Sequence, residues 1–314
     1  MYPLKFENLY YEKIWGGRKL SSYRRNLPQG NIGESWEIAC HKNGMSEVIN
    51  GKYKGKTLLE IIKDIGDLIV GDKVMKEGFA EGDFPLLVKI INSNENLSVQ
   101  VHPSDEYAHE IEGDNGKVEA WYIIDCEENA EIIVGTNGCT KEEFKRSCEY
   151  GTVESYMNRI PVKPGDLFFI EAGLLHSIGK GILLAEIQQN SDTTYRVYDY
   201  NRGRELHMKK ALDVIDFTLE PKIILIDENK KIQNCISFSG FNMDVYNIKG
   251  SYSEKSNSDK FCVLTCVDGE GKIKFTDGGI RKEIIISMLD SILIPAYLGE
   301  YILSGNMKLI KSYI

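Results

Sequence analysis

The chain has 314 residues, of which 42% are hydrophobic and 27% are charged, so it is long enough for one large or two ordinary globular domains. Its formal net charge of −9 argues against a nucleic-acid partner, because phosphate backbones are bound by clustered Lys and Arg. The N-terminal residues lack the pattern of a signal peptide, and no apolar run reaches the roughly 18 residues needed to span a bilayer. We therefore expect a cytoplasmic protein that does not contact membranes.

Cysteine usage supports the same compartment. The seven cysteines are odd in number and form no CxxC pair, whereas oxidised frameworks use even counts in short secreted chains. We expect buried, reduced thiols rather than disulfides or a metal cluster.

Hydrophobic spacing predicts four helices along the chain. Apolar residues recur three and four apart between Thr57 and Asp72, and Thr57 is suited to the N-cap. A short helix is predicted over Ser104–Glu112, with Ser104 as its cap. Helical spacing over Lys141–Met157 follows the capping-box pair Thr140 and Glu143, and a last helix is predicted over Leu206–Asp216.

Most of the remaining chain has the apolar pattern of short β-strands, and Gly and Asn turns separate these strands. Residues 84–102 give two strands, and 118–124 and 130–134 give a further pair. Strands dominate from residue 158 to 200 and again from about 220 to the end. The segments LFFIEA (167–172) and SILIPA (291–296), each just after an aspartate, form a weak internal repeat. We predict a mainly β protein of two related barrels with a few inserted helices.

Four side chains within this pattern are candidate metal ligands. Gln100 and His102 are two apart in the strand-like LSVQVH, so they share one face. Glu119 lies in the apolar run VEAWYII, where a lone buried carboxylate is costly unless it is paired or bound to metal. His176 ends the segment GDLFFIEAGLLH. Two imidazoles and two side-chain oxygens suit a divalent transition metal. The alternative for each residue taken singly is a hydrogen-bonded core position.

The segment ending at His176 resembles the second motif of the cupin superfamily, with Glu171 where proline is usual. The first cupin motif is altered, because Gln100 stands in place of its first histidine. The resemblance narrows further in the stretches PLLVKIINSNENLSVQVHP, GKVEAWYII, PVKPGDLFFIEAGLLHSIG and SDTTYRVYDYNR, with IWGG and IGESWEIACHKNG nearer the N-terminus. These are similar to the type I mannose-6-phosphate isomerase family in its short bacterial form. The likeness covers most of the chain to about residue 216.

The resemblance implies a catalytic, metal-binding cupin domain with helical insertions over residues 1–235. The internal repeat suggests a second, metal-free cupin-like domain over 236–314, where the family likeness is only loose. The resemblance also implies one Zn²⁺ per chain, other divalent metals also being possible, with Gln100, His102, Glu119 and His176 as ligands. The implied reaction interconverts mannose 6-phosphate and fructose 6-phosphate through an enediol, and the partner is therefore a small sugar phosphate. The sequence leaves the oligomeric state open.

Further site residues follow from charge and position. By the resemblance Arg196 is the active-site arginine, and its guanidinium suits a phosphate or enediolate; a structural ion pair with aspartate is the alternative. Lys117 is two residues before Glu119, so it shares the metal-facing side, and we expect a cation and partial burial to lower its pKa toward neutrality. Lys117 is a candidate acid or base, with His102 and a zinc-bound water as competing candidates, or else it is a solvated turn lysine. Lys89 and Ser98 are candidate phosphate contacts.

Two other activities fit the same residues. Two histidines and a carboxylate also suit an iron-dependent cupin oxygenase. A non-catalytic cupin that binds a sugar phosphate is the second alternative, because a fold alone does not assign a function.

Overall fold

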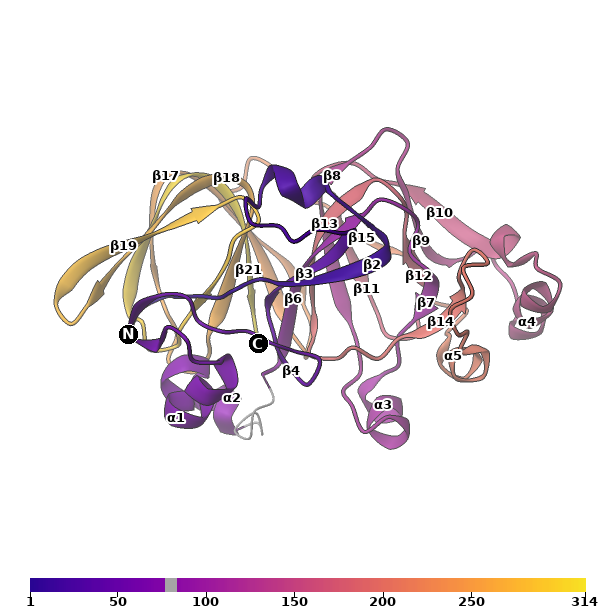
Figure 1. Ribbon diagram of the computed structural model, residues 1–314, viewed down its shortest axis with the longest axis horizontal. Coiled ribbons are helices and arrows are strands. Elements are labelled where there is room, and N and C mark those ends of the chain that lie inside the picture. The colour runs from indigo at the N-terminus through magenta and orange to yellow at the C-terminus, as the bar shows by residue number, and fades with distance from the viewer. Residues whose placement is uncertain (77–83) are drawn as a thin grey trace. The chain divides into compact units, whose positions relative to one another are not determined.

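The computed structural model describes residues 1–76 and 84–314 and is mainly β, as predicted (Figure 1). Its α-helices are few and short. They are α1 (Leu58–Val70), α2 (Asp72–Lys76), α3 (Asp105–Ile111), α4 (Lys141–Glu149) and α5 (Met208–Val214). Among the described residues, no helix is long and apolar enough to cross a membrane.

The predicted helices begin close to where their caps indicated. Thr57 and Thr140 each accept a hydrogen bond from the backbone N–H three residues on, and the glutamate there accepts one in return. Ser104 caps α3. The third helix is shorter than predicted: α4 ends at Glu149, because the chain then forms a 3₁₀ turn and enters a strand at Met157.

The chain divides into two compact units that are discontinuous in sequence. One unit, here unit 1, combines residues 1–9, 35–90 and 225–314; the other, unit 2, combines residues 10–34 and 91–224. Three of the boundaries fall inside strands, which are β2 (Leu9–Gly17), β3 (Ile32–Ile38) and β6 (Leu86–Ser93). The domain boundary at residue 235 stays a prediction from the sequence.

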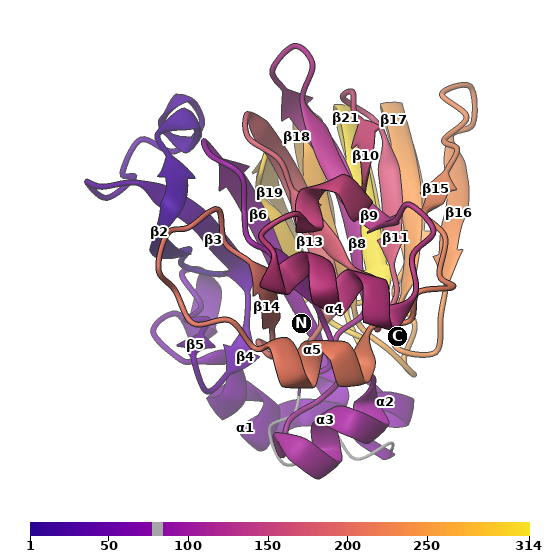
Figure 2. The ribbon, with the colours of Figure 1, turned by 90° about the vertical axis from the view of Figure 1, so that its right-hand side faces the viewer.

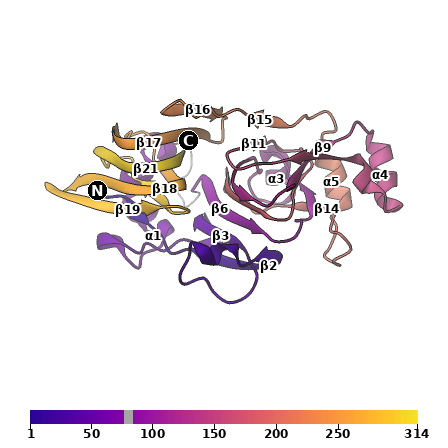
Figure 3. The ribbon, with the colours of Figure 1, turned by 90° about the horizontal axis from the view of Figure 1, so that it is seen from above.

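Unit 2 contains a five-stranded sheet in the order β10-β9-β12-β7-β14 and most of a seven-stranded sheet in the order β15-β11-β8-β13-β6-β3-β2. Seen from above, its strands run round a ring (Figure 3). The bounds of the remaining strands are β7 (Val99–Val101), β8 (Glu119–Cys126), β9 (Glu131–Thr136), β10 (Met157–Pro161), β11 (Leu167–Ile170), β12 (His176–Ile178), β13 (Ile182–Gln189), β14 (Tyr195–Tyr198) and β15 (Lys222–Ile224).

The two strands expected at 118–124 and 130–134 are present, and although they are neighbours in sequence they lie in different sheets. β8 lies between β11 and β13, whereas β9 lies between β10 and β12 in the other sheet. Closeness in sequence favours a hairpin, but here the segment between the strands carries the chain from one sheet to the other.

Hydrophobic cores lie on both sides of the five-stranded sheet. Ile132 and Val134 point inward and pack with Trp121 of β8, while Ile133, on the opposite face, packs with Phe144 of α4. The helices α4 and α5 lie side by side over this outer face (Figure 2). The sheet is therefore buried on both faces, which holds its inward-pointing side chains in fixed positions.

Unit 1 is built on a seven-stranded antiparallel sheet in the order β1-β20-β18-β21-β17-β16, with β19 paired to β18. The repeat seen in the sequence corresponds to β11 and β20, which are both buried four-residue strands. The bounds are β1 (Leu4–Lys5), β16 (Ile232–Ser237), β17 (Asn242–Lys255), β18 (Cys262–Asp277), β19 (Ile280–Ser287), β20 (Ser291–Ile294) and β21 (Glu300–Tyr313), with the short pair β4 (Cys40–His41) and β5 (Gly44–Met45).

Candidate metal centre

The alternation of β7 separates a polar face from an apolar one. Val99 and Val101 join the core beneath α4 and α5. Gln100, which lies between them, points to the opposite side, and so does His102, which follows the strand. A two-residue period therefore brings an amide and an imidazole together inside the barrel, as the sequence indicated.

Strand pairing brings the other two candidates to the same place. In the register of the five-stranded sheet, Gln100 lies opposite His176 of β12 on one side and Arg196 of β14 on the other. Glu119 is in the facing sheet, opposite Ile170 and Gln188. His176 and Arg196, each more than 70 positions from Gln100 in sequence, thus lie beside it because β12 and β14 pair with β7 on its two sides.

The predicted ligand atoms converge closely. His102 Nε2 lies 3.5 Å from Glu119 Oε2, and His176 Nε2 lies 3.4 Å from Glu119 Oε1. One ligand atom from each of these three residues lies within 4.8 Å of the others, and all three side chains are fully buried. The amide nitrogen of Gln100 is 3.5 Å from His176 Nε2.

Backbone carbonyls determine which nitrogen of each imidazole carries the proton. His176 Nδ1 is 2.7 Å from the carbonyl of Leu174, and His102 Nδ1 is 2.9 Å from that of Thr193. Since a carbonyl only accepts, each Nδ1 is the donor, and in a neutral ring Nε2 then carries a lone pair. Burial lowers the pKa of His176 to about 4, so this ring is neutral at pH 7.

These lone pairs are directed at an anion. The Glu119 oxygens are enclosed, and apart from the Lys117 ion pair no described group gives them a hydrogen bond. Lone pairs facing a carboxylate at 3.4–3.5 Å repel each other unless a cation lies between them. The side chains therefore fit a divalent metal better than they fit a hydrogen-bonded core.

A rotation of the Gln100 amide would bring its oxygen toward this set. Its Oε1 accepts a 3.4 Å hydrogen bond from the hydroxyl of Ser98, while its nitrogen faces His176. Turning the amide by 180° exchanges the two atoms, and the hydroxyl then accepts instead of donating. The oxygen would point to the same place as the two imidazoles and Glu119.

Lys117 lies directly beside this cluster. Its ammonium is 3.0 Å from Glu119 Oε2, and the side chain is buried rather than solvated. Burial alone lowers the pKa of Lys117, but the charges of Glu119 and Glu186 outweigh it, and the net shift is upward. The lowered pKa expected from the sequence depends on a nearby cation and stays a prediction.

Arg196 is connected to the ligands through Ser98. Its Nε donates to the Ser98 hydroxyl at 3.3 Å, and one terminal nitrogen donates to the carbonyl of Glu205 at 2.8 Å. Asp199 forms ion pairs with Arg202 and Arg204 instead of serving as the partner of Arg196. Ser98 thus lies between the arginine and Gln100, a position suited to orienting both.

Lys89 is the predicted site residue that belongs to unit 1. It lies in β6, is buried, and places its ammonium 4.9 Å from the centre of the Trp36 ring, a cation–π contact. Its role as a phosphate contact stays a prediction.

Two residues of the site were missed in the sequence. Trp121, two positions after Glu119, packs edge-on against His176 with ring centres 5.4 Å apart, and its indole N–H donates to Glu186 at 3.0 Å. Glu186 is buried in β13 and acts electrostatically on Lys117. A signal was present, since Glu186 interrupts the apolar run GILLAEI just as Glu119 interrupts its own strand.

Comparison with known proteins places this site in a family. Residues 4–146 match the family model described as "Phosphomannose isomerase type I, catalytic domain". Residues 231–314 match the family model described as "Mannose-6-phosphate isomerase, cupin domain". The chain is 41% identical to mannose-6-phosphate isomerase ManA of Bacillus subtilis, with 99% of each chain covered. The chain belongs to the type I phosphomannose isomerase family.

Other relatives agree with this assignment. The chain is 34% identical to the mannose-6-phosphate isomerase of Streptococcus mutans, over 99% of this chain and 98% of that one. The crystal structure of the mannose 6-phosphate isomerase from Bacillus subtilis superposes with a TM-score of 0.89 at 35% identity, covering 100% of both chains. A phosphomannose isomerase variant from Salmonella typhimurium shares the fold at 14% identity, with a TM-score of 0.79. The cupin fold expected from the sequence is confirmed.

Proposed function

We propose that the chain is a mannose-6-phosphate isomerase that interconverts mannose 6-phosphate and fructose 6-phosphate at a zinc ion. The observation that carries this proposal is the convergence of His102, Glu119 and His176, with both imidazole lone pairs directed at the carboxylate, in a chain 41% identical to such an isomerase over its length. Gln100 is proposed as the fourth ligand. Zinc suits two nitrogen and two oxygen donors, although other divalent ions share this preference.

The reaction moves one proton between neighbouring carbons. A proton leaves C2 of the open-chain aldose, an enediol forms, and a proton is returned to C1 to give the ketose. A bound divalent ion would supply Lewis-acid polarisation of the sugar oxygens. The protein must then provide a group that carries the proton and a group that stabilises the negative oxygens.

Lys117 is proposed to carry the proton. It is buried beside Glu119, within 3.0 Å of the carboxylate. A cation bound by Glu119 would weaken the attraction that raises the pKa of Lys117, and burial would then favour the neutral amine. A neutral amine accepts the proton from carbon, and the resulting ammonium returns it to the neighbouring carbon.

Arg196 is proposed to bind the negative oxygens of the substrate. Its guanidinium is half-buried and held by Ser98 and the Glu205 carbonyl, so its planar fork is already oriented. Lys89 and Ser98 are proposed as phosphate contacts. The Lys89→Ala variant tests the first of them: a phosphate contact predicts a raised KM with kcat nearly unchanged.

The test is a coupled assay for fructose 6-phosphate formed from mannose 6-phosphate, with and without a chelator. We expect turnover to stop on chelation, to return with zinc, and to be absent in the His176→Ala variant. His109→Ala is the matched control, because His109 is exposed and bonds only to Asn115 among the described side chains. Oxygen uptake without isomerisation would instead support an iron-dependent oxygenase. Sugar-phosphate binding without turnover in folded, metal-loaded protein would support a non-catalytic cupin.

We also propose that the enzyme works in the reducing cytoplasm on a small-molecule substrate. The structure describes all seven cysteines and shows no disulfide among them, and four are buried. The charge balance offers nothing that favours a nucleic-acid partner.

A further inference from the structure

A cavity separate from the candidate metal centre lies in unit 1, lined by residues of β17, β18, β20 and β21 and of the segment between β17 and β18. It has a volume of about 270 Å³. Its charged and polar lining includes Asp244, Glu254, Lys260, Tyr301, Lys311 and Tyr313. All of these residues lie within residues 225–314, and none belongs to the candidate metal centre. Its volume is near the lower end for ligand pockets, roughly 300–1,000 Å³, so an occupant would have the size of a single sugar unit.

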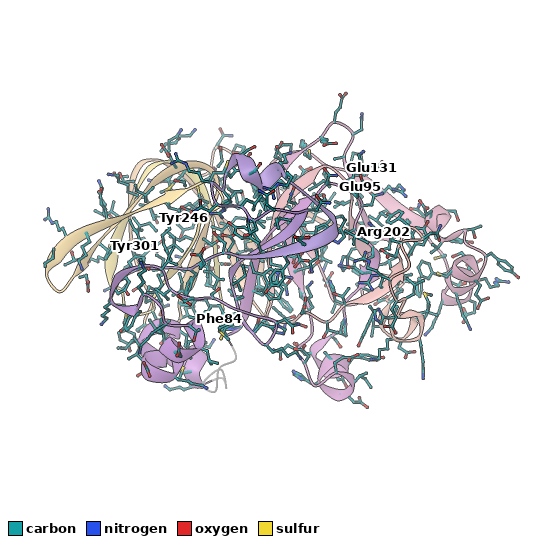
Figure 4. All side chains as sticks on the ribbon, viewed as in Figure 1. Phe84, Glu95, Glu131, Arg202, Tyr246 and Tyr301 are labelled. Atoms are coloured by element: carbon teal, nitrogen blue, oxygen red, sulfur yellow. The ribbon has the colours of Figure 1, made fainter. Side chains whose placement is uncertain are left out.

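The register of two long strands builds this cavity. β17 and β21 pair antiparallel, which sets Asp244 opposite Lys311 and Glu254 opposite Tyr301. Figure 4 labels Tyr301 and the neighbouring Tyr246 among the strands of this sheet. The hydrogen-bonded backbones of β17 and β21 therefore fix the positions of these four lining residues.

Part of the lining is already satisfied internally. The Tyr246 hydroxyl donates to Glu254 at 2.7 Å, and the ammonium of Lys311 lies 3.2 Å from that carboxylate and 3.2 Å from the hydroxyl. These three groups satisfy one another's charge and hydrogen-bonding capacity, and Glu254 and Lys311 line the cavity. They leave the other lining groups to a ligand.

Three remaining groups have unmet bonding capacity among the described residues. Lys260 forms no ion pair there; its ammonium lies 4.2 Å from the centre of the Tyr313 ring. Asp244 accepts hydrogen bonds from Asn234 and Tyr313; among the described residues it forms no ion pair, although its charge acts on Lys260 and Lys311. The Tyr301 hydroxyl is enclosed and has no hydrogen bond of good geometry, although the Cys262 thiol is near it.

The chemistry of these groups indicates one class of ligand. An ammonium without an ion pair binds phosphate as a point charge. Burial, together with nearby Lys73 and Lys311, lowers the pKa of Lys260, so a bound anion would stabilise its charged form. A carboxylate and an enclosed phenol accept and donate hydrogen bonds, as sugar hydroxyls require. A metal ion is disfavoured, because the lining contains no imidazole and carries lysines.

We propose that this cavity is a second ligand site, which takes a small polyhydroxylated phosphate. Lys260 holds the phosphate, while Asp244 and Tyr301 bond to the hydroxyls. The site does not depend on the isomerase assignment, because no residue of the metal centre takes part in it.

The test is calorimetric titration of the zinc-loaded full chain with glucitol 6-phosphate, which has no carbonyl group and is not isomerised. We expect two sites per chain in the wild type. In the Lys260→Met and Asp244→Asn variants, we expect the affinity of one site for glucitol 6-phosphate to fall at least tenfold. The affinity of the other site should be unchanged. The matched control is Lys282→Met, since Lys282 pairs with Asp277 on the surface and does not line this cavity. Unfolding temperatures confirm that each variant is folded.

Other outcomes have clear meanings. A single site per chain in the wild type, unaltered by Lys260→Met, overturns the proposal. Inorganic phosphate that fills the second site as tightly as glucitol 6-phosphate, with Asp244→Asn without effect, overturns the sugar part of it. The His176→Ala variant separates this site from the catalytic one: lost turnover with retained Lys260-dependent binding supports the second site whatever the reaction is.

Discussion

Single hydrogen bonds to backbone carbonyls prepare the candidate metal centre. Leu174 and Thr193 accept from the Nδ1 atoms of His176 and His102, which directs both Nε2 lone pairs toward Glu119. Partners of this kind in the second coordination sphere contribute roughly 10- to 100-fold to metal affinity in other proteins. The local chain near each histidine, and not only the histidine itself, therefore matters for binding.

Lys117 gives the first prediction at this scale. Replacing it by Met should lower kcat by about 10²- to 10⁴-fold, the usual contribution of a positioned acid or base. Metal content, measured by elemental analysis, should be retained, because the ligand atoms are unchanged. Lys180→Met, at an exposed position, is the control. A Lys117→Met enzyme within tenfold of the wild type would exclude Lys117 as the proton carrier.

Arg196 gives the second prediction at the residue scale. Lysine keeps the charge but cannot present two parallel N–H groups, so Arg196→Lys should lose roughly 10- to 100-fold in kcat/KM, the equivalent of one charged hydrogen bond. Arg159→Lys, on a half-exposed surface ion pair with Glu154, should have nearly wild-type kinetics. Equal kinetics for the two variants would show that the fork of Arg196 is not used.

The shared face of Gln100 and His102 and the burial of Glu119 could be predicted from the sequence, because each rests on a local rule. A two-residue period put Gln100 and His102 on one face, and an apolar neighbourhood marked Glu119 as a costly buried charge. The link from Arg196 through Ser98 to Gln100 could not be predicted, because it depends on the register between β7 and β14. Register is a tertiary property that a single sequence does not display.

At the scale of elements, the helices of unit 2 support the sheet that carries the ligands. Phe144 of α4 and Leu212 of α5 pack with Val99 and Val101, whose strand also holds Gln100. The apolar faces of these helices thus fix one side of β7. Their stability bears on the precision of the site, although no residue of α4 or α5 is part of it.

A capping variant tests how α4 contributes. Thr140→Ala removes the side-chain oxygen that accepts from the Glu143 N–H at 3.2 Å, and should cost about 1 kcal/mol in urea unfolding. Thr57→Ala removes the same motif from α1 in unit 1. Hydrogen exchange should speed up in α4 for the first variant and in α1 for the second. Exchange that rises equally everywhere would argue against separate local contributions.

The same cap has a defined pH dependence. The Thr140 backbone N–H and hydroxyl lower the pKa of Glu143 from 4.5. A lowered folded-state pKa means that this stabilisation is fully present above pH 4.5 and is lost as the pH falls through the lowered value. Glu143→Gln should therefore show a smaller loss of stability between pH 5 and 3 than the wild type, as measured by urea unfolding at each pH.

The starts of the helices were predicted well because a capping motif can be recognised from four consecutive residues of the sequence. Strand partners could not be predicted, and the segments 118–124 and 130–134 show why. Both segments are apolar and near in sequence, but β8 and β9 each satisfy their backbone groups in different sheets. Propensity identifies a strand, whereas the rest of the chain decides its partner.

Across the whole molecule, burial suppresses thiol chemistry. It raises the pKa of six of the seven cysteines, to about 11 for Cys148, Cys235 and Cys262 and about 12 for Cys266. Since the thiolate is the reactive form, the native protein should react slowly with a thiol reagent at pH 8 and more rapidly as the pH rises toward 10. Rapid modification of all seven at pH 8, with circular dichroism unchanged, would contradict this burial.

The division into two discontinuous units has a consequence for the order in which the chain matures. Leu4 of β1 is paired with Leu293 of β20, so the first strand waits until almost the entire polypeptide has left the ribosome. Unit 2, which holds His102, Glu119 and His176, contains no residue beyond 224. During synthesis unit 2 can therefore fold first, while the N-terminal segment has bonds to residues 47–50 and β1 lacks its strand partner. Such long-range closure is intrinsically slow, so the final folding step should belong to unit 1.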